Sequence, residues 1–363
     1  MEIAIIGLPQ SGKTTVFNAL TRGQADTTGA GGVGAQMHVG VAKVVDPRLA
    51  VLAEMYHPRK VVYPEIKYWD LPAVETRSKS QGVGGQSQNI LQAADAFLLV
   101  VRSFTDPAVV HPSGSIDVVR DLESALGEIA LADLVGLERI SQRLEDGVKK
   151  SLPSERPALI RQLDTVVKVK RGIEEGVPLR RQQLTASEQT GLAEYQLLTG
   201  KPVIVAVNTG ESAPEVRLEH LDISGGIADG LGQVSLCASL ESDLGQMTDE
   251  EAEEFRRELG LDQSAMNRVI EVSYDTVGLV SFLTVGEDEV RAWSVSKDLP
   301  AQDAAGTIHT DFSRGFIRAE VIPYEDLVRC GSIAQGRKEG VLRSEGKSYS
   351  VQDGDVINFL INT

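Results

Sequence analysis

Residues 1–20 read MEIAIIGLPQSGKTTVFNAL, and this stretch decides the fold class of the chain. The apolar run at residues 3–6 predicts a buried strand that ends at Gly7. From Gly7 to Thr14 the sequence follows the pattern G-x-x-x-x-G-K-T, and residues 15–20 predict a helix. A phosphate-binding loop requires this order of strand, loop and helix. The alternative is an ordinary strand–turn–helix, which rarely carries this pattern after an N-terminal buried strand.

Each position of the loop has a predicted chemical role. Backbone N–H groups of the loop and of the following helix N-terminus bind phosphate oxygens, so Gly7 and Gly12 must lack side chains. Lys13 is expected to reach the β- and γ-phosphates, and the Thr14 hydroxyl is expected to ligate Mg²⁺. The predicted nucleotide-binding residues of this stretch are Gly7, Pro9, Gln10, Ser11, Gly12, Lys13, Thr14 and Thr15.

A second strand is predicted over residues 61–69, and it ends at Asp70. In P-loop NTPases an aspartate at the end of a strand holds Mg²⁺, so we predict Thr14 and Asp70 as the metal residues. The predicted catalytic residues are Lys13 and Asp70. The alternative for Asp70 is a turn residue or a helix cap.

Composition narrows the class of protein. A chain of 363 residues with 42% hydrophobic residues predicts two or three globular domains. The formal net charge of −16 argues against generic binding to nucleic acid, and no DNA partner is expected. Cys237 and Cys330 have no metal-binding spacing and are interpreted as reduced residues of a cytoplasmic protein. No apolar run approaches the length of a membrane span, so no membrane partner is expected.

The middle of the chain has a helical pattern and a local excess of positive charge. Apolar residues recur every three to five positions after residue 117, and Pro153 and Pro157 interrupt the pattern before it resumes. This predicts two antiparallel helices in a coiled-coil-like hairpin. Nine basic and four acidic residues lie between Lys149 and Arg181, a local net charge of +5. This excess marks either an RNA-facing tip or only a solvated helix face.

The tetrad Asn208-Thr209-Gly210-Glu211 follows the predicted strand PVIVAVN. Guanine sites of P-loop proteins have Asn-Lys-x-Asp at this place. Here the lysine is absent and the acid is one methylene longer, so the geometry that pairs with guanine is lost or displaced. ATP is the first choice of ligand and GTP the second. The alternative is an ordinary turn at the end of a strand.

Several blocks resemble the YchF / Obg-like ATPase family, a group of P-loop proteins with a C-terminal TGS domain. The similarity runs nearly from end to end of the chain. It is carried by the blocks GLPQSGKTT, VVDPRLAVL, LCASLESDL, EVRAW, AAGTIHTDFSRGFIRAEVI, EGKSY and VQDGDVINF.

The resemblance implies an α/β fold with three parts. They are a Ras-like P-loop nucleotide domain at 1–117 and 196–277, an inserted antiparallel helical hairpin at 118–195, and a ubiquitin-like β-grasp (α+β) TGS domain at 278–363. It also implies ATP with Mg²⁺ as ligand, and association with the ribosome or with translation or stress factors. The basic region 149–181 and the TGS domain are the candidate contacts. The residues implied at the base are Asn208, Glu211, Cys237, Ala238 and Ser239.

The chain departs from the family pattern in both switch loops. Ala73, preceded by Pro72, stands where the family has the glycine that binds the γ-phosphate, and Ala35 lies near the expected threonine. Val74 takes the position of the water-orienting glutamine of Ras-like enzymes, and an apolar side chain cannot orient water. These changes predict slow ATP hydrolysis. The alternative is a divergent adaptor that binds ATP or GTP without an effective hydrolytic cycle.

Overall fold

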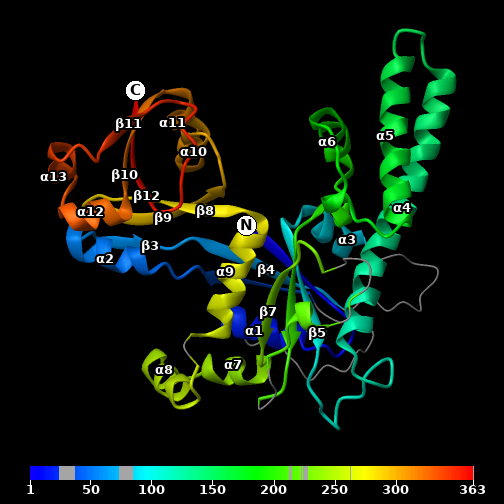
Figure 1. The fold of residues 1–363 in the computed structure, drawn as a ribbon, viewed down its shortest axis with the longest axis horizontal. Coiled ribbons are helices and arrows are strands. Elements are labelled where there is room, and N and C mark those ends of the chain that lie inside the picture. The colour runs from blue at the N-terminus through cyan, green and yellow to red at the C-terminus, as the bar shows by residue number, and fades with distance from the viewer. Residues whose placement is uncertain are drawn as a thin grey trace. The chain divides into compact units, whose positions relative to one another are not determined.

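The protein is described here from a computed structural model, in which contacts divide the chain into two compact units. The first unit is Met1–Val41 with Lys67–Val272, and the second is Ala42–Ile66 with Ser273–Thr363 (Figure 1). The structure describes residues 1–23, 37–72, 85–211, 215–221, 223, 228–261 and 263–362.

The first unit contains a six-stranded sheet of order β2-β4-β1-β5-β6-β7. Strand β1 pairs in parallel with β4 and β5, and β5–β6 and β6–β7 also pair in parallel. Every residue of β5 and β6 is buried, as expected for a parallel sheet covered on both faces. The carboxyl ends of the parallel strands therefore meet at one edge. The strands are β1 (Glu2–Ile6), β2 (His38–Lys43), β4 (Glu65–Asp70), β5 (Ala96–Arg102), β6 (Val203–Asn208) and β7 (Gly232–Leu236).

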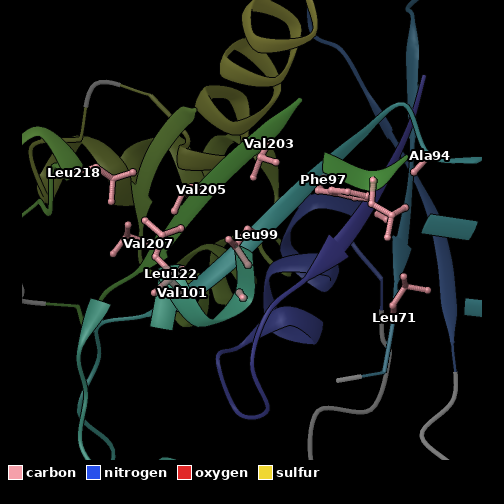
Figure 2. Close-up of a cluster of buried hydrophobic side chains, with 13 residues drawn as sticks. Leu71, Ala94, Phe97, Leu99, Val101, Leu122, Val203, Val205, Val207 and Leu218 are labelled. Atoms are coloured by element: carbon pink, nitrogen blue, oxygen red, sulfur yellow. The ribbon is translucent and has the colours of Figure 1, made fainter. Parts of the chain in front are cut away.

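Helices pack against this sheet around one apolar cluster. Figure 2 shows Leu99 and Val101 of β5, Val205 and Val207 of β6, and Leu122 of α4 within it. The helices described for this unit are α1 (Lys13–Thr21), α3 (Gly85–Ala93), α4 (Val118–Lys150), α5 (Arg156–Glu174), α6 (Ala186–Leu192), α7 (Ala238–Leu244) and α8 (Asp249–Glu258), with short 3-10 turns at Leu179–Arg181, Ala193–Tyr195, Leu198–Gly200 and Leu218–His220. Helix α9 (Ala265–Val277) begins in this unit, which ends at Val272.

The predicted helical hairpin is present as α4 and α5, which lie side by side (Figure 1). Leu137 and Leu144 of α4 share a buried cluster with Val166, Val169 and Ile173 of α5. The apolar residues at helical spacing therefore form the seam between the two helices. None of the helices in the described part of the chain combines the length and the apolar character that a membrane crossing requires.

The second unit contains a mixed six-stranded sheet of order β11-β10-β12-β8-β9-β3 with helices packed on it. Strand β10 pairs antiparallel with β11 and β12, and β8 with β9, whereas β12–β8 and β3–β9 are parallel. The α/β fold with a second α+β unit agrees with the predicted fold class. The elements are α2 (Pro47–Tyr56), β3 (Lys60–Val62), β8 (Leu279–Thr284), β9 (Glu289–Ser296), α10 (Ala301–Ile308), α11 (Thr310–Arg314), β10 (Phe316–Pro323), α12 (Tyr324–Cys330), α13 (Ile333–Lys338), β11 (Arg343–Glu345) and β12 (Asp355–Ile361).

The prediction of a single strand over residues 61–69 is wrong. The structure has two strands there, β3 and β4, and they belong to different sheets: Lys60 of β3 pairs with Glu289, and Lys67 of β4 pairs with Glu2. Pro64 separates them and has no N–H group to continue a ladder of hydrogen bonds. The pattern continues across the break because β3 has two partly buried valines and β4 has buried residues at alternate positions.

The segment Ala42–Ile66 lies in the second unit, whereas the sequence prediction placed it in the nucleotide domain. Leu49 and Leu52 of α2 are fully buried in a cluster that includes Leu283 and Val356. Arg48 of the same helix donates to an Asp353 carboxylate oxygen at 2.7 Å. Burial of this apolar helix face thus ties α2 to the C-terminal sheet, a long-range contact that local sequence pattern does not encode.

Candidate functional site

The phosphate loop joins β1 to α1 at the carboxyl edge of the first sheet. Gly7 has a φ of +144° and Gly12 a φ of +94°. A Cβ atom on Gly7 would lie 2.4 Å from the Val100 carbonyl oxygen, and one on Gly12 would lie 2.3 Å from Nδ2 of Asn208. Both positions therefore require glycine. This one segment contains all of the predicted loop residues, namely Gly7, Pro9, Gln10, Ser11, Gly12, Lys13, Thr14 and Thr15.

Lys13, at the first position of α1, turns its ammonium group back onto the loop. Nζ donates to the carbonyl oxygens of Gly7 at 3.0 Å and Leu8 at 2.9 Å, and the residue is 8% exposed. Burial lowers the pKa of Lys13 to about 8, and the Asp70 carboxylate partly opposes this shift. A buried ammonium with neutral acceptors is under-compensated, so an anionic phosphate group is a better partner for it than the loop carbonyls.

Thr14 and Asp70 meet although 56 positions separate them in the chain. The Thr14 hydroxyl donates to Oδ2 of Asp70 at 2.8 Å, and Asp70 is 3% exposed. His38, which begins β2, places Nδ1 3.4 Å from the same carboxylate oxygen. The metal site predicted from Thr14 and Asp70 did not include His38. The available signal was its position at the start of the strand that follows the first loop.

The hydroxyl oxygen of Thr14 and the carboxylate oxygens of Asp70 are suitable ligands for Mg²⁺. A hydroxyl and a carboxylate are hard oxygen donors, and Mg²⁺ is commonly held by one or two such groups together with phosphate oxygens and water. In the described part of the chain there is no cluster of three or more His, Cys, Asp or Glu residues able to hold a metal. The pair Thr14–Asp70 supplies two such oxygen donors, and phosphate oxygens and water can supply the others.

Asn208, at the end of β6, connects the phosphate loop to the loop after β7. Its Nδ2 donates to the Ser11 carbonyl oxygen at 3.1 Å, and its Oδ1 accepts from the backbone N–H of Ala238 at 3.1 Å. The side chain is 4% exposed. Asn208 thus holds two loops in register at the edge of the sheet, and contact with the base remains a prediction for this residue.

The other residues predicted at the base follow the carboxyl ends of β6 and β7. Glu211 is exposed, Ala238 is buried at the first position of α7, and Cys237 caps that helix. The Cys237 Sγ and Ser239 Oγ atoms are 3.2 Å apart. The structure therefore brings these predicted residues to the same edge as the phosphate loop, while the direct role of each at a base stays a prediction.

Sequence reasoning missed Phe104. A Cβ atom on Gly12 would lie 3.9 Å from Cε1 of its ring, and one on Gly210 would lie 4.0 Å from its Cβ atom. The ring of Phe104 is therefore close to the phosphate loop, and its Cβ atom is close to the turn after β6. The available signal was an aromatic residue two positions after the buried strand β5, on the edge where nucleotides bind in parallel α/β sheets.

The predictions on the two switch loops concern positions that the structure does not describe. Ala35, Ala73 and Val74 fall within residues 24–36 and 73–84, outside the described ranges, and Pro72 is the last described residue before the second gap. The slow hydrolysis expected from these substitutions stays a prediction.

A loop with two required glycines, a buried lysine, and a threonine–aspartate pair, all at the carboxyl edge of a parallel sheet, defines a P-loop nucleotide-binding protein. Two family models match the chain. One is described as a 50S ribosome-binding GTPase and matches residues 2–123, and the other, YchF-GTPase_C, is described as a protein of unknown function and matches residues 279–362.

Curated relatives match over the whole length. The chain is 35% identical to the ribosome-binding ATPase YchF of Bacillus subtilis, covering 100% of this chain and 99% of that protein. It is 37% identical to the protein of the same name from Haemophilus influenzae, covering 99% of each chain. The solved structure of the Schizosaccharomyces pombe YchF GTPase matches with a TM-score of 0.80 at 26% identity, covering 99% and 97% of the two chains. The chain belongs to the YchF family.

Proposed function

We propose that this protein binds Mg·ATP at the phosphate loop, hydrolyses it slowly, and associates with the ribosome as a nucleotide-dependent switch. The observation that carries the proposal is the convergence of Lys13, Thr14 and Asp70 at one edge of the sheet. The names of full-length relatives, ribosome-binding ATPases, support both the nucleotide and the partner.

The chain's own groups supply binding and charge stabilisation. The backbone N–H groups after Gly12 and the N-terminus of α1 face phosphate oxygens, and Lys13 exchanges its two loop carbonyls for the β- and γ-phosphates. Thr14 and Asp70 would hold Mg²⁺, which would supply positive charge beside the phosphates. Positioning and electrostatics of this kind account for most catalysis of phosphoryl transfer, and they fit slow turnover where Val74 replaces a water-orienting side chain.

The proposed site for the base lies next to Asn208, at the carboxyl end of β6. Asn208 fixes the loop of Cys237, Ala238 and Ser239, Phe104 offers an aromatic face, and Glu211 supplies a carboxylate that is exposed without a bound base. The sequence Asn-Thr-Gly-Glu lacks the lysine and the shorter acid of a guanine site. These features support adenine as the preferred base.

Calorimetric titration in the presence of Mg²⁺ tests this choice. We expect GTP to bind about tenfold or more weakly than ATP, because guanine leaves hydrogen-bonding groups without partners at this site. The Glu211→Asp variant, which restores the shorter acid, is expected to narrow the gap between the two nucleotides. Tighter binding of GTP than of ATP by the unchanged protein would refute the proposed role of Glu211.

The structure refines which basic residues of the hairpin are available to a ribosomal partner. Lys168 pairs with Glu188 at 2.8 Å, Lys170 pairs with Glu138, and Arg171 lies 3.6 Å from Glu175. These three cations on α5 are partly neutralised within the hairpin. The exposed cations at the turn between the helices, Lys149, Lys150 and Arg156, have one carboxylate partner among them in the described residues, Asp146 beside Lys149.

The tip of the hairpin, defined as Lys149, Lys150 and Arg156, is therefore the proposed contact with ribosomal RNA. We expect the triple change of these residues to glutamine to reduce co-sedimentation with ribosomes severalfold at low salt, because free surface cations dominate binding to a phosphate backbone. The triple change of Lys168, Lys170 and Arg171 to glutamine removes the same charge and is the matched control. Equal loss in both variants, or no loss at the tip, would dismiss this contact.

The second candidate function is an adaptor that binds nucleotide without an effective hydrolytic cycle. The substitutions at Ala35, Ala73 and Val74 favour it. The intact Lys13, Thr14 and Asp70 favour the ATPase, because a purely structural ligand does not require a paired threonine and aspartate for Mg²⁺. Both candidates predict nucleotide binding, and they differ only in cleavage of the γ-phosphate.

A further inference from the structure

Arg102, the last residue of β5, is a buried cation that forms no ion pair within the described residues. It is 3% exposed. Its hydrogen bonds go to backbone carbonyls of the following loop: Nε donates to Phe104 at 3.1 Å, and Nη2 donates to Val109 at 2.9 Å. Burial of a charge without a counter-ion is costly, so a residue of this kind needs a reason beyond packing.

The guanidinium group of Arg102 also lies on the ring of Phe104. Its central carbon is 4.3 Å from the ring centroid, within the range of a cation–π contact. The same side chain therefore fixes the backbone of Phe104 through Nε and the orientation of its ring through the stacked face. Phe104 also lies close to Gly12 of the phosphate loop and to Gly210 of the turn after β6.

Arg102 also lines a small cavity together with Ser11 of the phosphate loop. The Nη1 atom of Arg102 and the Ser11 hydroxyl are both buried and have no hydrogen-bond partner in the described part of the chain. The cavity has a volume of about 10 Å³, which is room for about one water molecule. His111 and Asp121, which also line it, bond to each other at 2.8 Å. One water between Nη1 and Ser11 Oγ would satisfy both orphan atoms.

We propose that Arg102 is a positioning residue that sets Phe104 as a wall of the base pocket, with one buried water anchoring the guanidinium to Ser11. The proposal rests on the ATP binding proposed above. Lysine cannot replace arginine here, because only a planar fork donates to separate carbonyls, reaches the water and stacks on the ring at once. The consequence is that Arg102 contributes to binding of the base and not to binding of the phosphates.

The test compares the binding of a ligand that carries a base with the binding of a ligand that has only phosphates. Calorimetry measures the affinity of ATP and of inorganic tripolyphosphate, each with Mg²⁺, for the full chain and for its Arg102→Lys and Arg102→Met variants. We expect ATP to bind about tenfold more weakly to both variants, a typical value for losing a base–aromatic contact, while tripolyphosphate affinity stays within about threefold. The Arg48→Lys variant, at a half-buried arginine of the second unit, is the control and should bind both ligands as the unchanged protein does.

Equal weakening of ATP and tripolyphosphate in the Arg102 variants would overturn the inference, because it would indicate a general structural role. Unchanged ATP affinity would overturn it as well. The Phe104→Leu variant keeps the test decisive if an Arg102 variant does not fold. It should reproduce the loss that is specific to ATP, and unaltered ATP affinity in it refutes the proposal. Failure of the unchanged protein to bind either ligand would instead reject the proposed function.

Discussion

The Lys13→Ala variant is expected to bind ATP at least tenfold more weakly than the unchanged protein. The ammonium group of Lys13 is buried, and within the described ranges its hydrogen bonds go to the carbonyls of Gly7 and Leu8, which phosphate oxygens can replace. A charge-assisted hydrogen bond to phosphate in a buried site is worth roughly 1.5–3 kcal/mol, which is about tenfold to a hundredfold in affinity. Titration of Mg·ATP followed by calorimetry measures the change.

The matched control for this lysine is Lys67→Ala. Lys67 is at the start of β4, toward the opposite edge of the sheet, and its Nζ donates to Glu2 at 3.2 Å. Its removal should leave ATP affinity unchanged, since exposed ion pairs contribute little and this one is far from the phosphate loop. If Lys13→Ala binds ATP as tightly as Lys67→Ala does, the phosphate loop is not the nucleotide site.

Loss of the Thr14–Asp70 pair is the second large effect. The Asp70→Asn variant keeps the shape of the side chain and removes its charge, and Thr14→Val removes the hydroxyl that donates to Asp70 at 2.8 Å. We expect Mg²⁺ to strengthen ATP binding to the unchanged protein, and we expect this increment to fall by about tenfold to a hundredfold in both variants, as is typical when a residue that supports a metal is lost. Titrations of ATP with Mg²⁺ and with EDTA give the increment.

The control for the carboxylate is Asp95→Asn, because Asp95 accepts from the backbone N–H of Glu2 and is exposed. Its Mg²⁺ increment should match that of the unchanged protein. A full increment retained by Asp70→Asn and Thr14→Val would mean that the ion is held elsewhere or only by the nucleotide.

The phosphate loop and its aspartate could be predicted because short-range rules determine them. Gly7, Gly12 and Lys13 follow a pattern whose chemistry is local. Asp70 was predicted from its place at the end of a strand, and parallel strands bring their carboxyl ends to one edge whatever their distance along the chain. That is why Thr14 and Asp70 lie within hydrogen-bonding distance, while their role at Mg²⁺ stays a prediction.

The partner of each strand could not be predicted in the same way. Residues 61–69 are rich in β-forming residues on both sides of Pro64, yet Lys60 pairs with Glu289 and Lys67 pairs with Glu2, in different sheets. The local sequence pattern predicts which residues are buried. It does not predict which strand or helix packs against them. The proline at position 64 was the available signal for the break, since it cannot donate to a ladder.

The amino-acid composition also could not predict which cations are buried or which are paired with carboxylates. Arg102 reads as an ordinary polar strand end, and only the structure shows its carbonyl partners and its contact with the ring of Phe104. Counting basic residues likewise treated Lys168 and Lys149 alike, whereas their carboxylate partners differ in position and exposure. A run of basic residues predicts a positively charged surface. The ion pairs within that surface decide which of its cations are available to a partner.

The central claim is that the bound ATP is cleaved, and single-turnover hydrolysis tests it most directly. The protein in excess over γ-labelled ATP with Mg²⁺ is sampled over hours beside the Lys13→Ala variant. We predict slow release of labelled phosphate that depends on Lys13, with Lys67→Ala retaining it. ATP that stays bound and intact in the unchanged protein over the same time would contradict the ATPase and leave the nucleotide-binding adaptor as the function.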